Sequence, residues 1–371
     1  MKINQIKTLK VFYNNREVGI IHEIEKSTFS FEYSESWIKD GFSISPFQLP
    51  LIKKIFISPK KTFDGLFGVF HDSLPDGWGE KITEKKLRNL GIEYDSLSPL
   101  TKLSLIGENS LGGLTYKPSQ FRSIPTSTQQ NFEKLYEEIN KILKDKDKYN
   151  IDSLYELCGS SGGARPKAHI LIKNEPWIIK FKHLYEPLDS GAKEFKVNKA
   201  AKKCNIELPE FKLIPSKKYH GFFACKRFDV MGKKKIHVIS LSGLLEVSHK
   251  EPILDYLHLF QVIDKIVIKN KKEQFKEAFK RMCFNYIFMN KDDHAKNFSF
   301  IFDEGIKSYK LSPAYDLTIT KNKLFHEMTF NQLENPKDKD LIKIGTMYGL
   351  TTKECLECLR KIQNIKNKFN T

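Results

Sequence analysis

Asp292 and Asn297 lie five positions apart in a polar stretch, residues 290–297, that separates two apolar segments. An Asp can accept the proton of a substrate hydroxyl, and an Asn five residues later can hold a metal ion. This is the spacing of a kinase catalytic loop. A simple turn would use fewer charges and more Gly or Pro. The spacing therefore indicates a loop that takes part in phosphoryl transfer.

A second carboxylate, Asp316, follows in the sequence Pro313-Ala314-Tyr315-Asp316-Leu317, after another short strand-like segment. Two loops that flank a hairpin would then deliver two carboxylates and an Asn. These are the oxygen ligands that a site needs to place Mg²⁺ over a triphosphate. We select Asp292 over Asp293 as the catalytic carboxylate because only Asp292 stands five residues before Asn297. His294 has two interpretations, a contact to phosphate or loop and a structural histidine.

Two features upstream complete the set. The Gly-rich stretch 159–167 can bring backbone N–H groups close to phosphate oxygens, although it lacks the Gly-Lys-Ser/Thr ending of a Walker loop. Lys180 ends an apolar strand soon after it, as the phosphate-binding lysine of kinases does. Glu194, on the helix that follows, is its candidate ion-pair partner. The order Gly-rich loop, Lys, Glu, Asp-x₄-Asn and Asp predicts a phosphotransferase.

Composition limits the class of protein. The chain has 371 residues, enough for two or three domains, and 40% hydrophobic residues, as in a globular protein. No apolar run approaches the roughly 18 residues that span a bilayer, and the N-terminus opens no apolar signal core, so we expect a cytoplasmic protein without a membrane partner. The net charge of +17 favours polyanionic partners. Cys355 and Cys358 form a lone C-x-x-C, which we interpret as two positions on adjacent helical turns.

The secondary-structure patterns change along the chain. Short strands separated by turn signals dominate residues 1–118, strands and helices alternate over 119–228, and long helical patterns dominate 229–371. Residues 119–131, rich in Ser, Thr, Gln and Pro, are the best linker candidate. The predicted fold is α+β, a bilobal kinase-like fold with an N-terminal β-rich subdomain, an α+β ATP-binding lobe and an all-helical C-terminal lobe.

Several segments, in this order, resemble the HipA-like serine/threonine kinases, the toxins of bacterial toxin–antitoxin pairs. The resemblance covers most of the chain. Its carriers are Leu74-Pro75-Asp76-Gly77-Trp78-Gly79, Leu105-Ile106-Gly107 with Gly112-Gly113-Leu114, the run from Ser160 to Ala168, Arg227-Phe228-Asp229, the run from Asp292 to Ser299, and Pro313-Ala314-Tyr315-Asp316-Leu317.

The resemblance implies a role for each matching residue. Asp292 would be the catalytic base, Asn297 and Asp316 would hold Mg²⁺, and Lys180 would bind ATP phosphates. Ser160, with Ser161 beside it, matches the position at which family members phosphorylate themselves; a phosphate there adds negative charge in a site built for phosphate oxygens, so inactivation is physically reasonable. The remaining implied ATP-binding residues are Gly162, Gly163, Ala164, Arg165, Pro166, Lys167, the hinge Lys226, Arg227 and Phe228, and His294 and Tyr315.

The resemblance also implies ATP and Mg²⁺ as cofactors, an aminoacyl-tRNA synthetase as the protein substrate, and a small helix-turn-helix antitoxin as partner, through which DNA is reached indirectly. Two departures stand out: the hinge carries Lys226 where the family often has an acidic residue, and the region after Asp316 is short. Two other functions stay open, a small-molecule or lipid kinase and a pseudokinase that serves as a binding module.

Overall fold

The computed structural model describes residues 3–58, 62–121, 131–146, 149–320 and 322–369. The chain divides into two compact units. The first comprises Met1–Ala192, Lys212–Ile239 and Gly243–Glu246, and the second comprises Lys193–Phe211, Ser240–Ser242 and Val247–Thr371. Most of the linker predicted at 119–131 lies outside the described residues.

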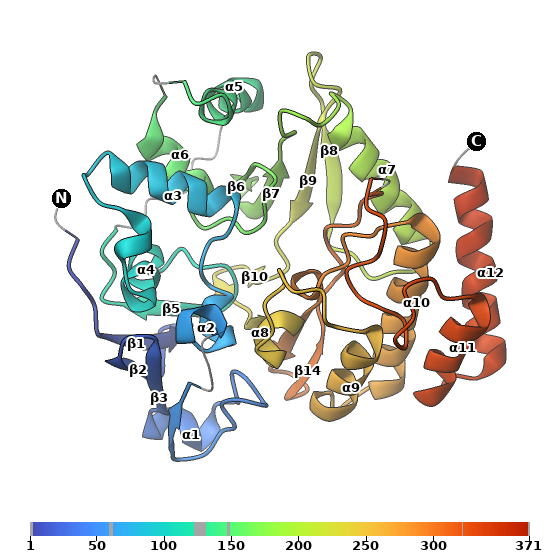
Figure 1. Cartoon of the computed structure of the whole chain (residues 1–371), viewed down its shortest axis with the longest axis horizontal. Coiled ribbons are helices and arrows are strands. Elements are labelled where there is room, and N and C mark those ends of the chain that lie inside the picture. Colours follow the sequence, from blue (N-terminus) through green and yellow to red (C-terminus); the bar gives the residue numbers. More distant parts are fainter. Residues whose placement is uncertain (1–2, 59–61, 122–130, 147–148, 321, 370–371) are drawn as a thin grey trace. The chain divides into compact units, whose positions relative to one another are not determined.

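The first unit opens with an antiparallel sheet of five strands in the order β4-β3-β2-β1-β5 (Figure 1). Alternation explains these strands: Leu9, Val11 and Tyr13 face the core, while the residues between them are exposed or half-buried. The strands are β1 (Thr8–Tyr13), β2 (Arg16–Glu25), β3 (Thr28–Tyr33), β4 (Ile55–Ile57) and β5 (Leu114–Lys117).

A second sheet follows, in the order β6-β7-β9-β8, in which β6 pairs with β7 and β7 with β9 in antiparallel directions. Its apolar face packs against three amphipathic helices, α3, α5 and α6, in a core that includes Trp78, Tyr136 and Trp177. The strands are β6 (Lys167–Ile172), β7 (Glu175–Lys180), β8 (Phe211–Ile214) and β9 (Phe222–Lys226); the helices are α3 (Trp78–Arg88), α5 (Phe132–Leu143) and α6 (Ile151–Cys158).

Short elements join these sheets and lead out of them. They are α1 (Glu35–Asp40), η1 (Thr62–Gly65), α2 (Gly68–His71), η2 (Tyr94–Ser96), α4 (Pro99–Ile106), β10 (Val230–Met231), β11 (Lys234–Lys235), β12 (Val238–Ser240) and α8 (Leu241–Leu245).

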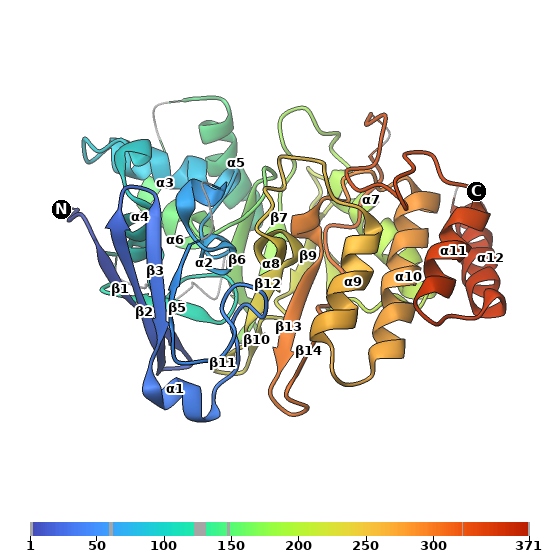
Figure 2. The same cartoon turned by 60° about the horizontal axis from the view of Figure 1, so that its bottom comes forward.

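The second unit is built around α10 (Lys271–Phe288), which packs between α9 (Tyr256–Ile266) and α12 (Thr352–Phe369) (Figure 2). A capping box begins α12: the Thr351 hydroxyl accepts from the Glu354 N–H, and the Glu354 carboxylate accepts from the Thr351 N–H. The unit also contains α7 (Ser190–Lys203) for most of its length, η3 (Ala295–Asn297), the hairpin β13 (Ser299–Asp303) and β14 (Ser308–Leu311), and α11 (Asp338–Met347).

The mixed α+β fold predicted from the sequence is confirmed. The region 229–371 is mainly helical but not all-helical as expected, because it also contains the short strands β10, β11 and β12 and the hairpin β13–β14. Cys355 and Cys358 lie on adjacent turns of α12, as interpreted from the sequence. None of the helices formed by the described residues combines the length and apolar character needed to cross a membrane.

Candidate active site

The loop 290–297 connects α10 to β13 and is closed by its own residues. The Asn297 side-chain amide donates a hydrogen bond to the Asp292 carbonyl over 2.7 Å, and the Asn297 N–H donates to the His294 carbonyl over 2.8 Å. The five-residue spacing therefore has a structural reason, because it lets Asn297 close the loop on Asp292. Met289, at φ +57°, turns the chain out of α10 into this loop.

The Asp292 carboxylate lies at the surface, with 41% of its side chain exposed. The ammonium of Lys323 lies 2.5 Å from it and 2.6 Å from the Glu327 carboxylate. Burial alone would lower the pKa of Lys323, but the hydrogen bonds to the two carboxylates raise it above its ordinary value. The cation is thus firmly charged next to Asp292.

Asp293 faces the opposite way. Its side chain is completely buried and accepts hydrogen bonds from the Tyr256 hydroxyl, from His326 Nδ1, both at 2.7 Å, and from the Glu327 N–H at 2.9 Å. Asn285 donates to the same Tyr256 hydroxyl, which extends the network into α10. Asp293 therefore anchors the loop, and Asp292 is the neighbouring carboxylate that can meet a substrate.

Tyr315 ties the second predicted segment, 313–317, to the loop. Its hydroxyl donates to the Lys296 carbonyl over 2.6 Å and lies 2.5 Å from the Ser299 hydroxyl. The next residue, Asp316, has φ +54°, a backbone conformation that costs a non-glycine residue energy and is concentrated at functional sites. After the hairpin β13–β14 the chain comes back to the loop 290–297, because Tyr315 is hydrogen-bonded to Lys296. Asp316 is the next residue in sequence.

The residues that would bind magnesium have suitable chemistry. Among the described residues there is no group of three or more His, Cys, Asp or Glu side chains that could hold a metal ion. Mg²⁺ in phosphotransfer sites needs fewer, since it commonly binds one or two protein carboxylates together with phosphates and water. The Asp316 carboxylate and the Asn297 amide oxygen match that donor set, because Asn297 uses its nitrogen, not its oxygen, to close the loop.

His294, the remaining predicted residue of this loop, keeps both of its interpretations. Its ring centre lies 5.4 Å from that of His249, and its Nδ1 is buried without a hydrogen-bond partner among the described residues.

In the first unit, the Gly-rich stretch 159–167 lies between α6 and β6 and is held by the segment 74–79. Gly163, at φ +79°, donates its N–H to the Asp76 carboxylate and accepts from the Trp78 N–H over 2.9 Å. A Cβ on Gly77 would come within 2.7 Å of the Gly163 carbonyl carbon, so only glycine fits this approach. Two segments that are 80 residues apart in sequence therefore form one structure.

The basic residues of this stretch are engaged with the protein. Lys167 donates to the Gly162 carbonyl, and Arg165 donates to the Phe181 carbonyl and lies 3.4 Å from the Glu186 carboxylate. Lys180 is paired with Lys167 across β6 and β7 and is buried, with its ammonium 5.6 Å from the Phe223 ring centre. The structure thus brings Lys167, Lys180 and the Gly-rich stretch together. Ala164 and Pro166 flank Arg165 in this stretch. The Pro166 carbonyl accepts a hydrogen bond from the Phe181 N–H.

The two serines of this stretch differ in exposure. Ser161 is fully buried, and its hydroxyl lies 3.1 Å from His169 Nε2. Burial, with the nearby Arg227 charge, lowers the pKa of His169 to about 3, so this histidine is neutral. Ser160 is half-buried. Of the two, Ser160 is the hydroxyl that solvent can reach.

The hinge 226–228 ends β9. Lys226 pairs with Glu175, and the Arg227 N–H donates to the Pro176 carbonyl over 2.9 Å. Arg227 also forms a two-point ion pair with Asp229, which accepts the Gly112 N–H over 2.8 Å. Burial alone would raise the pKa of Asp229, but Arg227 lowers it to about 2. Phe228 stands between the two charged residues in sequence.

Glu194 lies buried on α7, where its carbonyl accepts from the Asn198 side chain. Its pairing with Lys180 stays a prediction. Sequence reasoning gave no role to Lys323, Asp76 or Asp229, which contact the predicted site residues. Asp76 and Asp229 stood inside segments already singled out, whereas Lys323 gave no signal.

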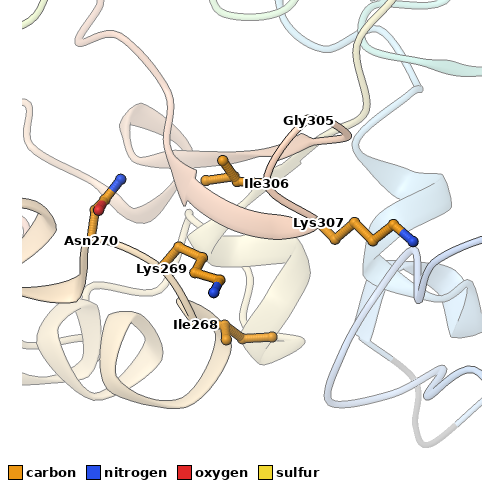
Figure 3. Close-up of a pocket in the computed structure, with 6 residues that line it drawn as sticks. All are labelled: Ile268, Lys269, Asn270, Gly305, Ile306 and Lys307. Atoms are coloured by element: carbon orange, nitrogen blue, oxygen red, sulfur yellow. The ribbon is translucent and has the colours of Figure 1, made fainter.

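Figure 3 shows a pocket in the second unit. Ile268, Lys269 and Asn270 line it before α10, and Gly305, Ile306 and Lys307 line it at the hairpin tip. The loop begins at the other end of α10 and precedes the other end of the hairpin. The pocket is therefore not part of the candidate active site.

Two family models match most of the chain. The model of the HipA-like C-terminal domain matches residues 159–369, more than half of the chain, and that of the HipA N-terminal domain matches residues 9–117. A search of curated proteins gave no match.

Two solved structures are similar. The first is HipA in the Shewanella oneidensis MR-1 complex of HipA, HipB and operator DNA: TM-score 0.73, 17% identity, and coverage of 98% of this chain and 90% of that one. The second is the Helicobacter pylori proinflammatory kinase CtkA, with a TM-score of 0.39, 12% identity, and coverage of 55% of this chain and 90% of that one. The second similarity is too low to support an argument. The family models, together with the fold shared with the Shewanella protein, show that this chain belongs to the HipA-like family.

Proposed function

We propose that the chain is an ATP- and Mg²⁺-dependent serine/threonine protein kinase that acts as a growth-arresting toxin. The observation that carries the proposal is the loop 290–297. The Asn297 side chain closes this loop by a hydrogen bond to the Asp292 carbonyl, and the buried Asp293 carboxylate anchors it by a hydrogen bond from the Tyr256 hydroxyl. The Asp292 carboxylate stays exposed, with the Lys323 ammonium beside it. Phosphoryl transfer to an alcohol requires a carboxylate that is held in place and can orient the substrate hydroxyl.

In this mechanism each residue has one task. Asp292 orients the substrate hydroxyl and accepts its proton, while the ion pair with Lys323 holds the carboxylate in place. Asn297 and Asp316 would hold Mg²⁺, which, when bound, neutralises charge on the transferred phosphate. Lys167, Lys180 and the Gly-rich stretch would receive the ATP phosphates, and the hinge 226–228 would meet the adenine.

For the Gly-rich stretch to bind phosphates, Gly163 and Lys167 have to give up their present hydrogen bonds and donate to phosphate oxygens instead. Gly163 now donates to Asp76, and Lys167 donates to the Gly162 carbonyl. Both donors are of the kind that bind phosphate oxygens. Phosphorylation of the accessible Ser160 would add a dianion beside them and compete with ATP, so we include inactivation by autophosphorylation in the proposal.

The proposed partners follow from the family. A HipB-like antitoxin with a helix-turn-helix fold is the expected binding partner, because the Shewanella relative is a complex of HipA, HipB and operator DNA. Contact with DNA would then be indirect. A component of translation, such as an aminoacyl-tRNA synthetase, is the proposed substrate.

The test uses the full chain, its Asp292→Gln variant and an Asp264→Asn control, whose carboxylate is half exposed and paired with Lys271. Each is incubated with labelled ATP and Mg²⁺, alone and with a bacterial lysate. We expect label on protein serine or threonine with the wild type and the control, and a loss of about 100-fold or more with Asp292→Gln. Equal transfer by all three would remove Asp292 from the mechanism, and label found only on small molecules would replace the protein-kinase proposal.

A further inference from the structure

Four of the six cysteines belong to the second unit, and none has a role in the proposed mechanism. Cys204 follows α7, Cys283 lies on α10, and Cys355 and Cys358 lie one turn apart on α12. Because α12 packs against α10, thiols from distant parts of the sequence meet. All four are free thiols, and Cys358 alone among them is not buried.

Cys283 and Cys358 are in direct contact. Their thiols share a hydrogen bond, and Cys283 is fully buried behind the partly exposed Cys358. The charged groups facing Cys358 are Lys280 and Glu277 on α10 and Lys361 one turn further along α12. Two ammonium groups against one carboxylate give Cys358 a positive surrounding.

This surrounding separates Cys358 from the other thiols of the cluster. The hydrogen bond from Cys283 lowers the pKa of Cys358, burial raises it, and Lys280 and Lys361 lower it again, with a net decrease. Burial raises the pKa of Cys355 to about 11 and that of Cys204 to about 12, and it holds that of Cys283 well above the ordinary value. Of the four thiols, Cys358 is therefore the one whose pKa is shifted towards the thiolate, the reactive form of cysteine, and it lies beside the Cys283 thiol.

We propose that Cys358 and Cys283 form a peroxide-reactive pair in which Cys358 is oxidised first and Cys283 resolves it to a disulfide between α12 and α10. The inference rests on the contact, the exposure of one thiol and the burial of the other, and does not depend on the proposed kinase activity. A partly exposed thiolate poised next to a second thiol is the arrangement of redox-sensing cysteines.

The chemistry balances with hydrogen peroxide as the oxidant. The Cys358 thiolate attacks one peroxide oxygen, the O–O bond breaks, and the products are the sulfenic acid and hydroxide. The Cys283 sulfur then attacks the Cys358 sulfur; an S–S bond forms, the S–O bond breaks, and the Cys283 proton leaves with the hydroxyl group as water. Two electrons pass from the two thiols to the peroxide.

The test is a peptide map of the reduced full chain after treatment with hydrogen peroxide. Trypsin releases residues 282–291, which contain Cys283, and residues 354–360, which contain Cys355 and Cys358. We expect these peptides to be joined, with a mass lower by two hydrogen atoms than their sum. Fragmentation of the joined peptide should place the bond on Cys358, and Cys355→Ala should keep it.

Two variants and a rate measurement complete the test. Cys358→Ser should abolish the joined peptide, and Cys283→Ala should leave Cys358 to oxidise to the sulfinic acid. In the unmodified chain, iodoacetamide at neutral pH should label Cys358 at least about 10-fold faster than Cys355, and Lys361→Gln should slow that labelling about two- to three-fold. A bond through Cys355, a bond between two copies of 354–360, or equal labelling of both cysteines would each overturn the proposal.

Discussion

The Lys323 ammonium lies 2.5 Å from the Asp292 carboxylate and joins it to Glu327. This contact gives the exposed carboxylate a fixed orientation and a compensating charge in the same place. We expect Lys323→Gln to lower the rate of phosphoryl transfer about 10-fold, because a misplaced carboxylate orients the hydroxyl poorly. Lys323→Arg should retain more of the rate, and Lys339→Gln, which removes an exposed lysine, should retain all of it. A faster Lys323→Gln enzyme would mean that the lysine inhibits Asp292.

Substitution of Asp293 should mainly lower stability, whereas substitution of Asp292 should mainly lower activity. Asp293→Ala leaves the Tyr256 hydroxyl and His326 without their buried acceptor, and should lower the free energy of unfolding of the second unit by about 3 kcal/mol. Asp292→Asn removes a surface charge and should change stability by less than about 0.5 kcal/mol while it abolishes transfer. Hydrogen exchange of peptides from α9 and α10 measures the first effect. Similar protection in both variants would contradict the division of roles.

Gly77 and Gly91 offer a matched pair for the contact between segments 74–79 and 159–167. Both have a positive φ, but a Cβ at Gly91 meets nothing within 4 Å, whereas one at Gly77 meets the Gly163 backbone. Gly91→Ala should cost about 1 kcal/mol from the backbone alone. Gly77→Ala should cost about 2 kcal/mol more, because the Gly-rich stretch must move.

Urea unfolding followed by tryptophan fluorescence measures these costs, since Trp37, Trp78 and Trp177 all lie in the first unit. Equal costs at Gly77 and Gly91 would mean that the Gly-rich stretch yields without resistance.

Asp229 makes the stability of the first unit depend on acid. Because its pKa in the folded protein is about 2, below the ordinary 3.8, the folded state binds fewer protons than the unfolded state between those values. The stabilisation is therefore complete above about pH 4 and is lost as the pH falls towards 2, an effect of about 2 kcal/mol. Asp229→Asn should remove this dependence and cost about 3 kcal/mol at neutral pH, because it leaves buried Arg227 unpaired.

The control for this prediction is Asp40→Asn, which breaks the exposed ion pair with Arg16 and should cost less than about 1 kcal/mol. An acid dependence that persists in Asp229→Asn would assign it to other carboxylates.

Local sequence patterns were enough to predict much of the secondary structure. Apolar periodicity in the sequence predicts one helix over Phe132–Leu143 and another over Lys272–Met289. The first has these bounds in the structure, and the second differs from α10 by one residue at each end. The first also has a local start signal, because the Asn131 side chain caps it by accepting from the Glu133 and Lys134 N–H groups. Apolar periodicity reports on neighbouring turns, so it finds such helices without tertiary information.

The contacts that complete the site are of another kind. Asp76 with Gly163, Gly112 with Asp229, and Lys323 with Asp292 each join residues that are 31 to 117 positions apart. No periodicity or spacing within one segment encodes such a pairing, because it depends on how separate elements pack. The sequence therefore predicted which segments matter and left open which of them touch.

The contact between Asp76 and Gly163 bears on how this chain can be divided. The Gly-rich stretch takes its shape from a segment that precedes the linker candidate, so the two are parts of one folding unit in which neither is complete alone. A gene cut before residue 119 would encode a fragment whose Gly163 amide has lost its acceptor and whose Trp78-containing core is open. Recombination or fragment design for this protein therefore has to keep the β-rich region 1–118 and the Gly-rich stretch 159–167 together in one fragment.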